Sequence, residues 1–526
     1  MSTHEKIGLG RGLLNAGKIN EFNEYLRELK LDDPLAYSVL DVNLALYRNM
    51  FSEAIRKARG LIKRVVDKPE VAKFVFSSLG RAYRFIGEID TSDRYLIQAA
   101  EIAEFLGDHD YAYNERLEIM VNKCLKAEYE PAYKEIRSLL REHTSSPSRY
   151  YGMYILASLE VVLGRTDRTM ENLDRLISNP DFIHRLRLGA SEMKGLLTRL
   201  LGRVEKAQKI FIETAKSFME IKSAYVCFPL AKALEISRLT SLALSPRQFI
   251  RESIKLSRKG SPGEIAAADE VEALLVVDEK EASERLFEAA QGYHIVYQNM
   301  EAFWSGLTAA YIAWKSDSPL FTKIIKFLSP LAPLHPGFKK DPLLGKFLAQ
   351  VEPLMSSQTC GSEAKGIRAN LIGGLRLTVD GTEISTMGWG RGGAVSCLVY
   401  LLLSPRHRIP GDHLFYLLWP NKKYSPGTRR WLYNLITTIR KNLGRPNILI
   451  KRGDFYQLED VWTDLGEIEN LLRLADATHD LAEKEEYLSR ARDLAKGELL
   501  PEFPYDPYID EYRQYYKQLR KRIFGQ

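Results

Sequence analysis

The sequence is poor in cysteine and lacks long uncharged apolar runs. No two of its four cysteines form a Cys-x-x-Cys pair; they are Cys124, Cys227, Cys360 and Cys397. This spacing excludes the usual zinc-ligand pattern and a disulfide framework, and it fits a reducing cytoplasm. The N-terminal segment lacks a signal-peptide core, and no apolar run reaches the roughly 18 residues that a membrane-spanning helix needs. We therefore expect a cytoplasmic protein without membrane contact.

Catalytic motifs are also missing. We find no Ser/His/Asp set, no paired-carboxylate pattern, no His-Glu-x-x-His and no receiver-like phosphoacceptor domain. Residues 12–18 have the glycine and lysine spacing of a phosphate-binding loop, but Ile19 stands where a magnesium-ligating Ser or Thr belongs. We interpret this stretch as the turn of a helical hairpin. The sequence predicts no enzyme, no cofactor and no metal site.

Acidic residues are nearly absent from one block of the chain. The formal net charge is only +7, but residues 384–453 contain twelve Lys or Arg and a single acid, Asp412. In residues 454–526 the balance reverses, with seventeen Asp or Glu against ten Lys or Arg. A concentrated positive field favours nucleic-acid binding. The basic block is therefore the first candidate for a nucleic-acid site.

The N-terminal two thirds of the sequence is repetitive. Turn-like residues stand between amphipathic helical segments at Gly17, Asn49, Gly87, Ala127, Gly164 and Gly202, and the last five are spaced by 38, 40, 37 and 38 residues. Such a period is typical of a helical solenoid. Small residues such as Gly80 and Gly195 are expected where paired helices cross closely, and larger ones such as Leu96 and Phe211 are expected to fill the layer between successive hairpins.

This pattern resembles the tetratricopeptide repeat over residues 5–240, and segments with a helical pattern continue to residue 354. We expect a helical repeat domain over residues 1–355. The polar stretch 356–366 is rich in small residues and is interpreted as a linker.

Residues 367–460 are predicted to form a winged-helix domain. Alternating apolar residues flank Asp380-Gly381, a strong hairpin signal. Two apolar helices follow at 395–403 and 413–419, the second with Asp412 as its N-cap. A third helix, 426–443, starts after Ser425 and ends at Gly444, and a second hairpin, the wing, covers 448–458.

The third helix is expected to have one buried and one basic face. At helical spacing, the core stripe contains Leu432, Leu435, Ile436, Ile439 and Leu443. The other face and the wing offer side chains that read base edges or neutralise phosphates. The predicted DNA-binding residues are Arg429, Arg430, Asn434, Thr437, Thr438, Arg440, Lys441, Lys451 and Arg452.

Two plainer interpretations stay open at this point. An isolated basic helix face is often merely solvated, although here it occurs within a complete winged-helix order of elements. The tryptophans Trp389, Trp419 and Trp431 are better explained by core or edge packing than by base stacking.

The domain is similar to the DNA-binding domain of the SARP family, regulators of antibiotic pathways with an OmpR-like winged helix. The resemblance rests on Trp389-x-Arg391, the run 398–403, Leu418-Trp419-Pro420 and Leu435-x3-Ile439-Arg440-x2-Leu443. The stretch from Trp462 through Leu500-Pro501 to Tyr512 resembles the start of the bacterial transcriptional activator domain of that family, and we place it at 461–526. In the family such repeats usually follow the winged helix, whereas here they precede it.

The resemblance implies a bacterial transcription regulator, with activation as the family's usual role. The mainly α-helical fold class is a tetratricopeptide-like solenoid, a small α+β winged helix and a short helical extension. Expected partners are double-stranded DNA, RNA polymerase or another protein, and a second copy of the chain, with the repeats sensing a signal. The alternative is a protein-interaction scaffold whose winged helix does not read DNA.

Overall fold

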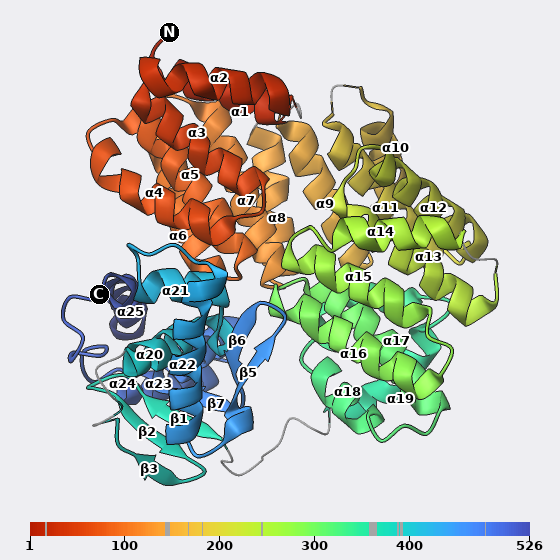
Figure 1. The fold of residues 1–526 in the computed structure, drawn as a ribbon. Helices are drawn as coiled ribbons and strands as arrows, with labels where there is room; N and C mark the ends of the chain where they lie inside the picture. Colours follow the sequence, from red (N-terminus) through yellow and green to blue (C-terminus); the bar gives the residue numbers. More distant parts are fainter. Residues whose placement is uncertain are drawn as a thin grey trace. The chain divides into compact units, whose positions relative to one another are not determined.

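The computed structural model describes residues 1–526 except positions 16–17, 143–147, 167, 181, 243–245, 357–365, 387–388, 390–392, 479 and 526. The chain divides into two compact units, Met1–Cys360 and Gly361–Gln526 (Figure 1). Gly17 and Arg391, both singled out from the sequence, lie outside the described residues, and so does almost all of the predicted linker.

The first unit is built from helices that pack mainly against their neighbours in the chain. They are α1 (Thr3–Asn15), α2 (Ile19–Asp32), α3 (Pro34–Tyr47), α4 (Phe51–Val65), α5 (Pro69–Phe85), α6 (Ile89–Phe105), α7 (His109–Leu125), α8 (Tyr129–Glu142), α9 (Arg149–Leu163), α10 (Thr169–Ser178), α11 (His184–Leu200), α12 (Val204–Glu220), α13 (Cys227–Thr240), α14 (Arg247–Ser257), α15 (Pro262–Leu274), α16 (Glu279–Ile295), α17 (Asn299–Lys315), α18 (Phe321–Leu328) and α19 (Gly345–Ser356), with the 3-10 helices η1 (Ala224–Val226), η2 (Ala332–Leu334) and η3 (Pro336–Lys340). The predicted helical solenoid is confirmed.

The predicted turns have a common backbone geometry. The last five turn residues of the predicted series all have a positive φ, between 58° at Asn49 and 85° at Gly87. At Gly87 the N–H of the turn residue donates to the carbonyl of Arg84 and the next N–H donates to that of Tyr83. This pair of bonds satisfies carbonyls that the helix end leaves free, and it requires the left-handed conformation that glycine adopts easily.

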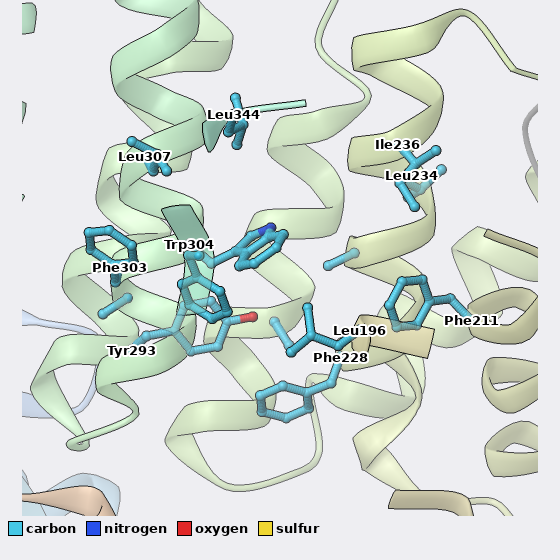
Figure 2. Close-up of a cluster of buried hydrophobic side chains, with 14 of the residues drawn as sticks. Leu196, Phe211, Phe228, Leu234, Ile236, Tyr293, Phe303, Trp304, Leu307 and Leu344 are labelled. Atoms are coloured by element: carbon cyan, nitrogen blue, oxygen red, sulfur yellow. The ribbon is translucent and has the colours of Figure 1, made fainter. Parts of the chain in front are cut away.

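Close helix crossings explain the small residues within the repeats. A Cβ atom built on Gly80 would lie 2.6 Å from the Leu96 side chain, and one on Gly195 would lie 2.6 Å from the Phe211 ring. Each pair joins the two helices of one hairpin. The close crossings at the glycines are as predicted, whereas Leu96 and Phe211 contact the partner helix of their own hairpin (Phe211 in Figure 2). Gly12, in the stretch that resembles a phosphate-binding loop, lies inside helix α1.

The second unit combines two small sheets with helices. The strands β1 (Ile367–Asn370), β2 (Arg376–Val379), β3 (Thr382–Ile384) and β7 (Val461–Thr463) form a sheet in the order β3-β2-β1-β7. The strands β4 (Arg408–Pro410), β5 (Leu449–Arg452) and β6 (Phe455–Leu458) form the other, in the order β4-β6-β5. The helices are α20 (Ala394–Leu403), α21 (Gly411–Leu418), α22 (Pro426–Asn442), α23 (Asp464–Ala477), α24 (Leu481–Leu494) and α25 (Pro507–Phe524).

This element order is the sheet, three helices and hairpin predicted for a winged helix. The hairpin turn at Asp380-Gly381 is confirmed, because both residues have a positive φ, of 48° and 82°. The N-cap predicted at Asp412 is wrong. Helix α21 starts earlier, at Gly411 after Pro410, so Asp412 lies within the first turn and its carboxylate accepts from the N–H of His413 at 2.8 Å.

The C-terminal helices share one core with the winged helix. Strand β7, which the sequence pattern did not predict, pairs in parallel with β1. Just after it, the buried carboxylate of Asp464 accepts hydrogen bonds from the N–H groups of Leu371 and Ile372 at 2.9–3.0 Å. The hydroxyl of Tyr508 on α25 lies 2.9 Å from that of Ser404. Residues 461–526 therefore hold the first sheet and α20 in place.

Candidate nucleic-acid interface

Helix α22 is fixed at both ends. At its start, the Ser425 hydroxyl accepts from the N–H of Thr428 at 3.3 Å, and the Thr428 hydroxyl accepts from the N–H of Ser425 at 2.9 Å. Pro426 occupies the first turn, where its missing N–H costs nothing. At the other end Gly444 has a φ of 69° and its N–H donates to Lys441. The helix bounds predicted from Ser425 and Gly444 are confirmed to within one residue.

One face of α22 lies in the core of the unit. Leu432, Ile436 and Ile439 are fully buried, and Leu443 follows at the end of the same stripe. Leu435 is half-buried, at the margin of this stripe. The helix packs against α20, α21 and β5. Because the apolar stripe is held from three sides, the opposite face has a fixed orientation toward solvent.

The opposite face of α22 is basic and polar. Arg430, Asn434, Thr437 and Lys441 are exposed, one helical turn apart, as the pattern predicts. No acidic residue occurs anywhere in the helix. Arginine, asparagine and lysine side chains at this spacing match the donors and acceptors of base edges and phosphates in a major groove.

Arg429 and the two threonines on or beside this face also interact with groups of the protein itself. The Arg429 guanidinium lies over the ring of Tyr424, 5.3 Å from its centroid, a contact that the sequence did not indicate. The hydroxyls of Thr437 and Thr438 donate to helix carbonyls four residues earlier, at 2.9 and 3.0 Å. Their donor protons are therefore used within the helix, which leaves the oxygen lone pairs and the methyl groups for an outside partner.

Arg440 differs from the other predicted contact residues. It is half-buried, and its Nε donates to the carbonyl of Leu449 on β5 at 2.7 Å. This bond ties the end of α22 to the wing. Arg440 therefore sets the position of the wing against the helix, a role that the sequence did not reveal because the two groups meet only in the folded unit.

The wing is a short hairpin with mixed charge. Lys451 is exposed near its tip, whereas Arg452 is half-buried and lies 3.5 Å from the carboxylate of Glu459. Asp454, which the sequence interpretation did not single out, is exposed in the turn itself. Its carbonyl accepts from the N–H of Gly411 at 2.8 Å and so anchors the turn to α21. The wing thus presents one free lysine and one opposing carboxylate.

Several other basic side chains of residues 384–453 are paired with or packed against groups of the same unit. Arg408 is buried beside the ring of Phe455, and Arg445 forms an ion pair with Asp380 at 2.9 Å. Among the described residues of this block, the exposed basic side chains cluster in the loop before α22, on α22 and on the wing; they are Lys422, Lys423, Arg429, Arg430, Lys441 and Lys451. The exposed positive charge of the described part of this block is therefore concentrated on one helix and the two segments beside it.

The tryptophans pack as the sequence predicts. Trp389 is buried and its Nε1 donates to the carbonyl of Ser385 at 2.8 Å. Trp419 and Trp431 meet edge to face, with centroids 5.7 Å apart. Trp431 is 43% exposed and so closes the edge of this aromatic cluster.

Within the described ranges we find no group of three potential metal ligands. None of the helices described is both long and apolar enough to cross a membrane.

No family model matches the sequence, and no curated protein matches it. Solved structures with similar helical folds include the Rap protein complexed with competence and sporulation factor, at 11% identity and a TM-score of 0.45 over 66% of this chain and 98% of that one. The Naa15/Naa10 structure with HypK-THB has 10% identity and a TM-score of 0.18, covering 94% of this chain and 88% of that one. A circular tandem repeat protein has 12% identity and a TM-score of 0.13, over 99% of this chain and 96% of that one.

Proposed function

We propose that this protein is a sequence-specific, double-stranded DNA-binding transcription regulator. The observation that carries the proposal is the exposed face of α22, which has Arg430, Asn434, Thr437 and Lys441 in one line and no acid. A helix that only needed solubility would carry both signs of charge, because mixed charges stabilise it at i, i+4 spacing. No family model supports the similarity to the SARP regulators, so the proposal depends on this surface and on the winged-helix order of elements.

In this proposal α22 enters the major groove and the wing lies along the phosphate backbone. Asn434, at the middle of the exposed face, reads an adenine edge, and Arg430 reads a guanine edge. Lys441 and Lys451 neutralise phosphates and add affinity without sequence choice. The repeat unit receives a signal or a partner, such as RNA polymerase, and pairs two chains on one site, since a single winged helix covers only a short half-site.

The proposal is tested by selecting duplexes from a random pool with the full-length protein. We expect enrichment of a common motif, and we expect Asn434→Ala to reduce discrimination at one position by about 1–3 kcal/mol, the value of a bidentate base contact. Lys451→Ala should weaken binding to all duplexes alike. Lys517→Ala, at an exposed lysine of α25, is the matched control.

A folded protein that enriches no motif and binds no duplex would contradict the proposal. The scaffold alternative would then be favoured. Uniform loss of affinity in both variants would instead show that the reading face is misassigned.

A further inference from the structure

Helix α22 exposes an aromatic ring that the fold does not use. Among the described residues of 367–460, the exposed large apolar side chains are Trp431 and Tyr433, both on α22, and Tyr433 is 58% exposed. Trp431 packs edge to face on Trp419. Within the described part of the chain, no group stacks on the ring of Tyr433 or bonds to its hydroxyl. A single exposed ring is common on protein surfaces, so its position on the helix decides what it can contact.

Tyr433 lies beside Thr437, on the side of α22 that faces the wing. Residues four apart are neighbours on a helix surface, and Thr437 follows Tyr433 by four. Arg440 follows Tyr433 by seven, which places both on the same side of the helix two turns apart. Because Arg440 bonds to the carbonyl of Leu449 on β5, that side is the one next to the wing. Tyr433 therefore borders the polar face of α22 on its wing side.

Thr437 offers its methyl group to an outside partner. Its hydroxyl donates to the carbonyl of Tyr433 at 2.9 Å, which holds the oxygen toward the helix backbone. The residue is exposed, and its donor proton is already used. The ring of Tyr433 and the methyl group of Thr437 are thus two adjacent apolar groups, the apolar pair, on a face that is otherwise basic and polar.

We infer that Tyr433 and Thr437 recognise the 5-methyl group of a thymine in the DNA site. The inference rests on the proposed function, because it requires α22 to lie in the major groove. In that groove the 5-methyl group of thymine is the apolar group among the hydrogen-bond donors and acceptors of the base pairs. The apolar pair matches this methyl group, whereas Arg430 and Asn434 match the polar groups of neighbouring positions.

Two competing contacts would use the hydroxyl groups of the same residues. The Tyr433 hydroxyl would donate to a phosphate, or the Thr437 oxygen would accept from a base amino group. Tyr433→Phe and Thr437→Val remove these hydroxyls and keep the ring and the methyl group. If the apolar pair reads thymine, both variants should therefore bind DNA as the wild type does.

The test uses the full-length protein and the duplex that it selects, with each thymine of the motif replaced in turn by deoxyuridine. This replacement removes the methyl group and keeps the base pairing. Fluorescence anisotropy should show a position at which deoxyuridine weakens wild-type binding about fourfold, the value of burying one methyl-sized group. Tyr433→Ala and Thr437→Ser, which remove the ring and the methyl group, should each reduce this difference, and the double variant should abolish it.

Tyr433→Phe and Thr437→Val are the matched controls and should retain the fourfold difference; loss of the difference in either variant overturns the inference in favour of a hydroxyl contact. A selected motif without thymine, or equal binding of thymine and deoxyuridine duplexes at every position, also overturns it and leaves sequence-specific DNA binding in place. The single variants provide the comparison if the double variant binds too weakly to measure, and an unchanged difference in both of them counts against the apolar pair. A folded protein that binds no duplex contradicts the proposed function and the inference together.

Discussion

His335 makes the repeat unit sensitive to acid in a way that can be measured. The ring is fully buried between η2 and η3 and stacks on Phe303, with centroids 4.9 Å apart. Its Nδ1 lies 2.8 Å from the carbonyl of Leu331 and its Nε2 lies 3.0 Å from the hydroxyl of Tyr129. Burial lowers the pKa of His335 to about 4, because a charged imidazole would be desolvated there.

The lowered pKa of His335 determines the direction and the size of the change in unfolding free energy with pH. In the unfolded chain the pKa of the ring is near 6.5. Between pH 6.5 and 4 the ring is therefore protonated in the unfolded chain but not in the folded unit. The folded unit is then fully stabilised above pH 6.5, and this contribution is lost as the pH falls toward 4. A difference of about 2.5 pKa units corresponds to about 3 kcal/mol of unfolding free energy.

The variant His335→Phe removes the titrating group and keeps an aromatic ring in the stack. Loss of the hydrogen bonds of His335 should shift the unfolding free energy of the variant by a constant amount relative to the wild type. Between pH 6.5 and 4, the unfolding free energy of the variant should fall by about 3 kcal/mol less than that of the wild type. Glu270, whose raised pKa acts in the opposite direction, is present in both proteins and cancels in the comparison. Denaturant titration at a series of pH values measures the difference, with His109→Phe, at an exposed ring, as control. Parallel curves for wild type and His335→Phe would refute the reasoning.

Three further predictions concern single side chains. Gly337→Ala places a Cβ 2.5 Å from the carbonyl oxygen of Val161 and should cost about 1–3 kcal/mol in denaturant titration, whereas Gly12→Ala meets open space and should not destabilise. Arg199→Met leaves two buried carboxylates without their cation and should lower the unfolding free energy by about 3–5 kcal/mol; an unchanged midpoint would contradict this. Asp454→Asn removes the acid of the wing turn and should tighten binding to every duplex, as measured by fluorescence anisotropy; equal or weaker binding would count against the wing contact.

The repeat architecture could be predicted because its turns have a sequence signal. Glycine or asparagine marks the left-handed residue at most of the predicted turns, and the period then locates the helix pairs. The same signal fails where another residue adopts that conformation. Lys222, Tyr297 and Asp317 all have a positive φ, from 48° to 63°, although such side chains rarely mark a turn in a sequence.

The candidate interface was predictable in its local features and not in its long-range contacts. Helical spacing alone assigns Leu432 to the core and Arg430 to the surface, because a helix repeats every 3.6 residues. The bond from Arg440 to the carbonyl of Leu449 and the pairing of β7 with β1 depend on how elements meet in space.

The most direct test of DNA binding is the salt dependence of affinity for the full-length protein. Each phosphate contact changes the slope of log affinity against log salt by about 0.9. The double variant Arg430→Ala, Lys441→Ala should therefore bind more weakly, and the lost phosphate contact of Lys441 should make its slope shallower by about 1. The control Lys484→Ala, Lys517→Ala, at exposed lysines of α24 and α25, should retain the wild-type slope. A folded wild-type protein that does not bind duplex DNA at low salt, or variant and control slopes that coincide, would contradict the assignment of α22 as the DNA-reading helix.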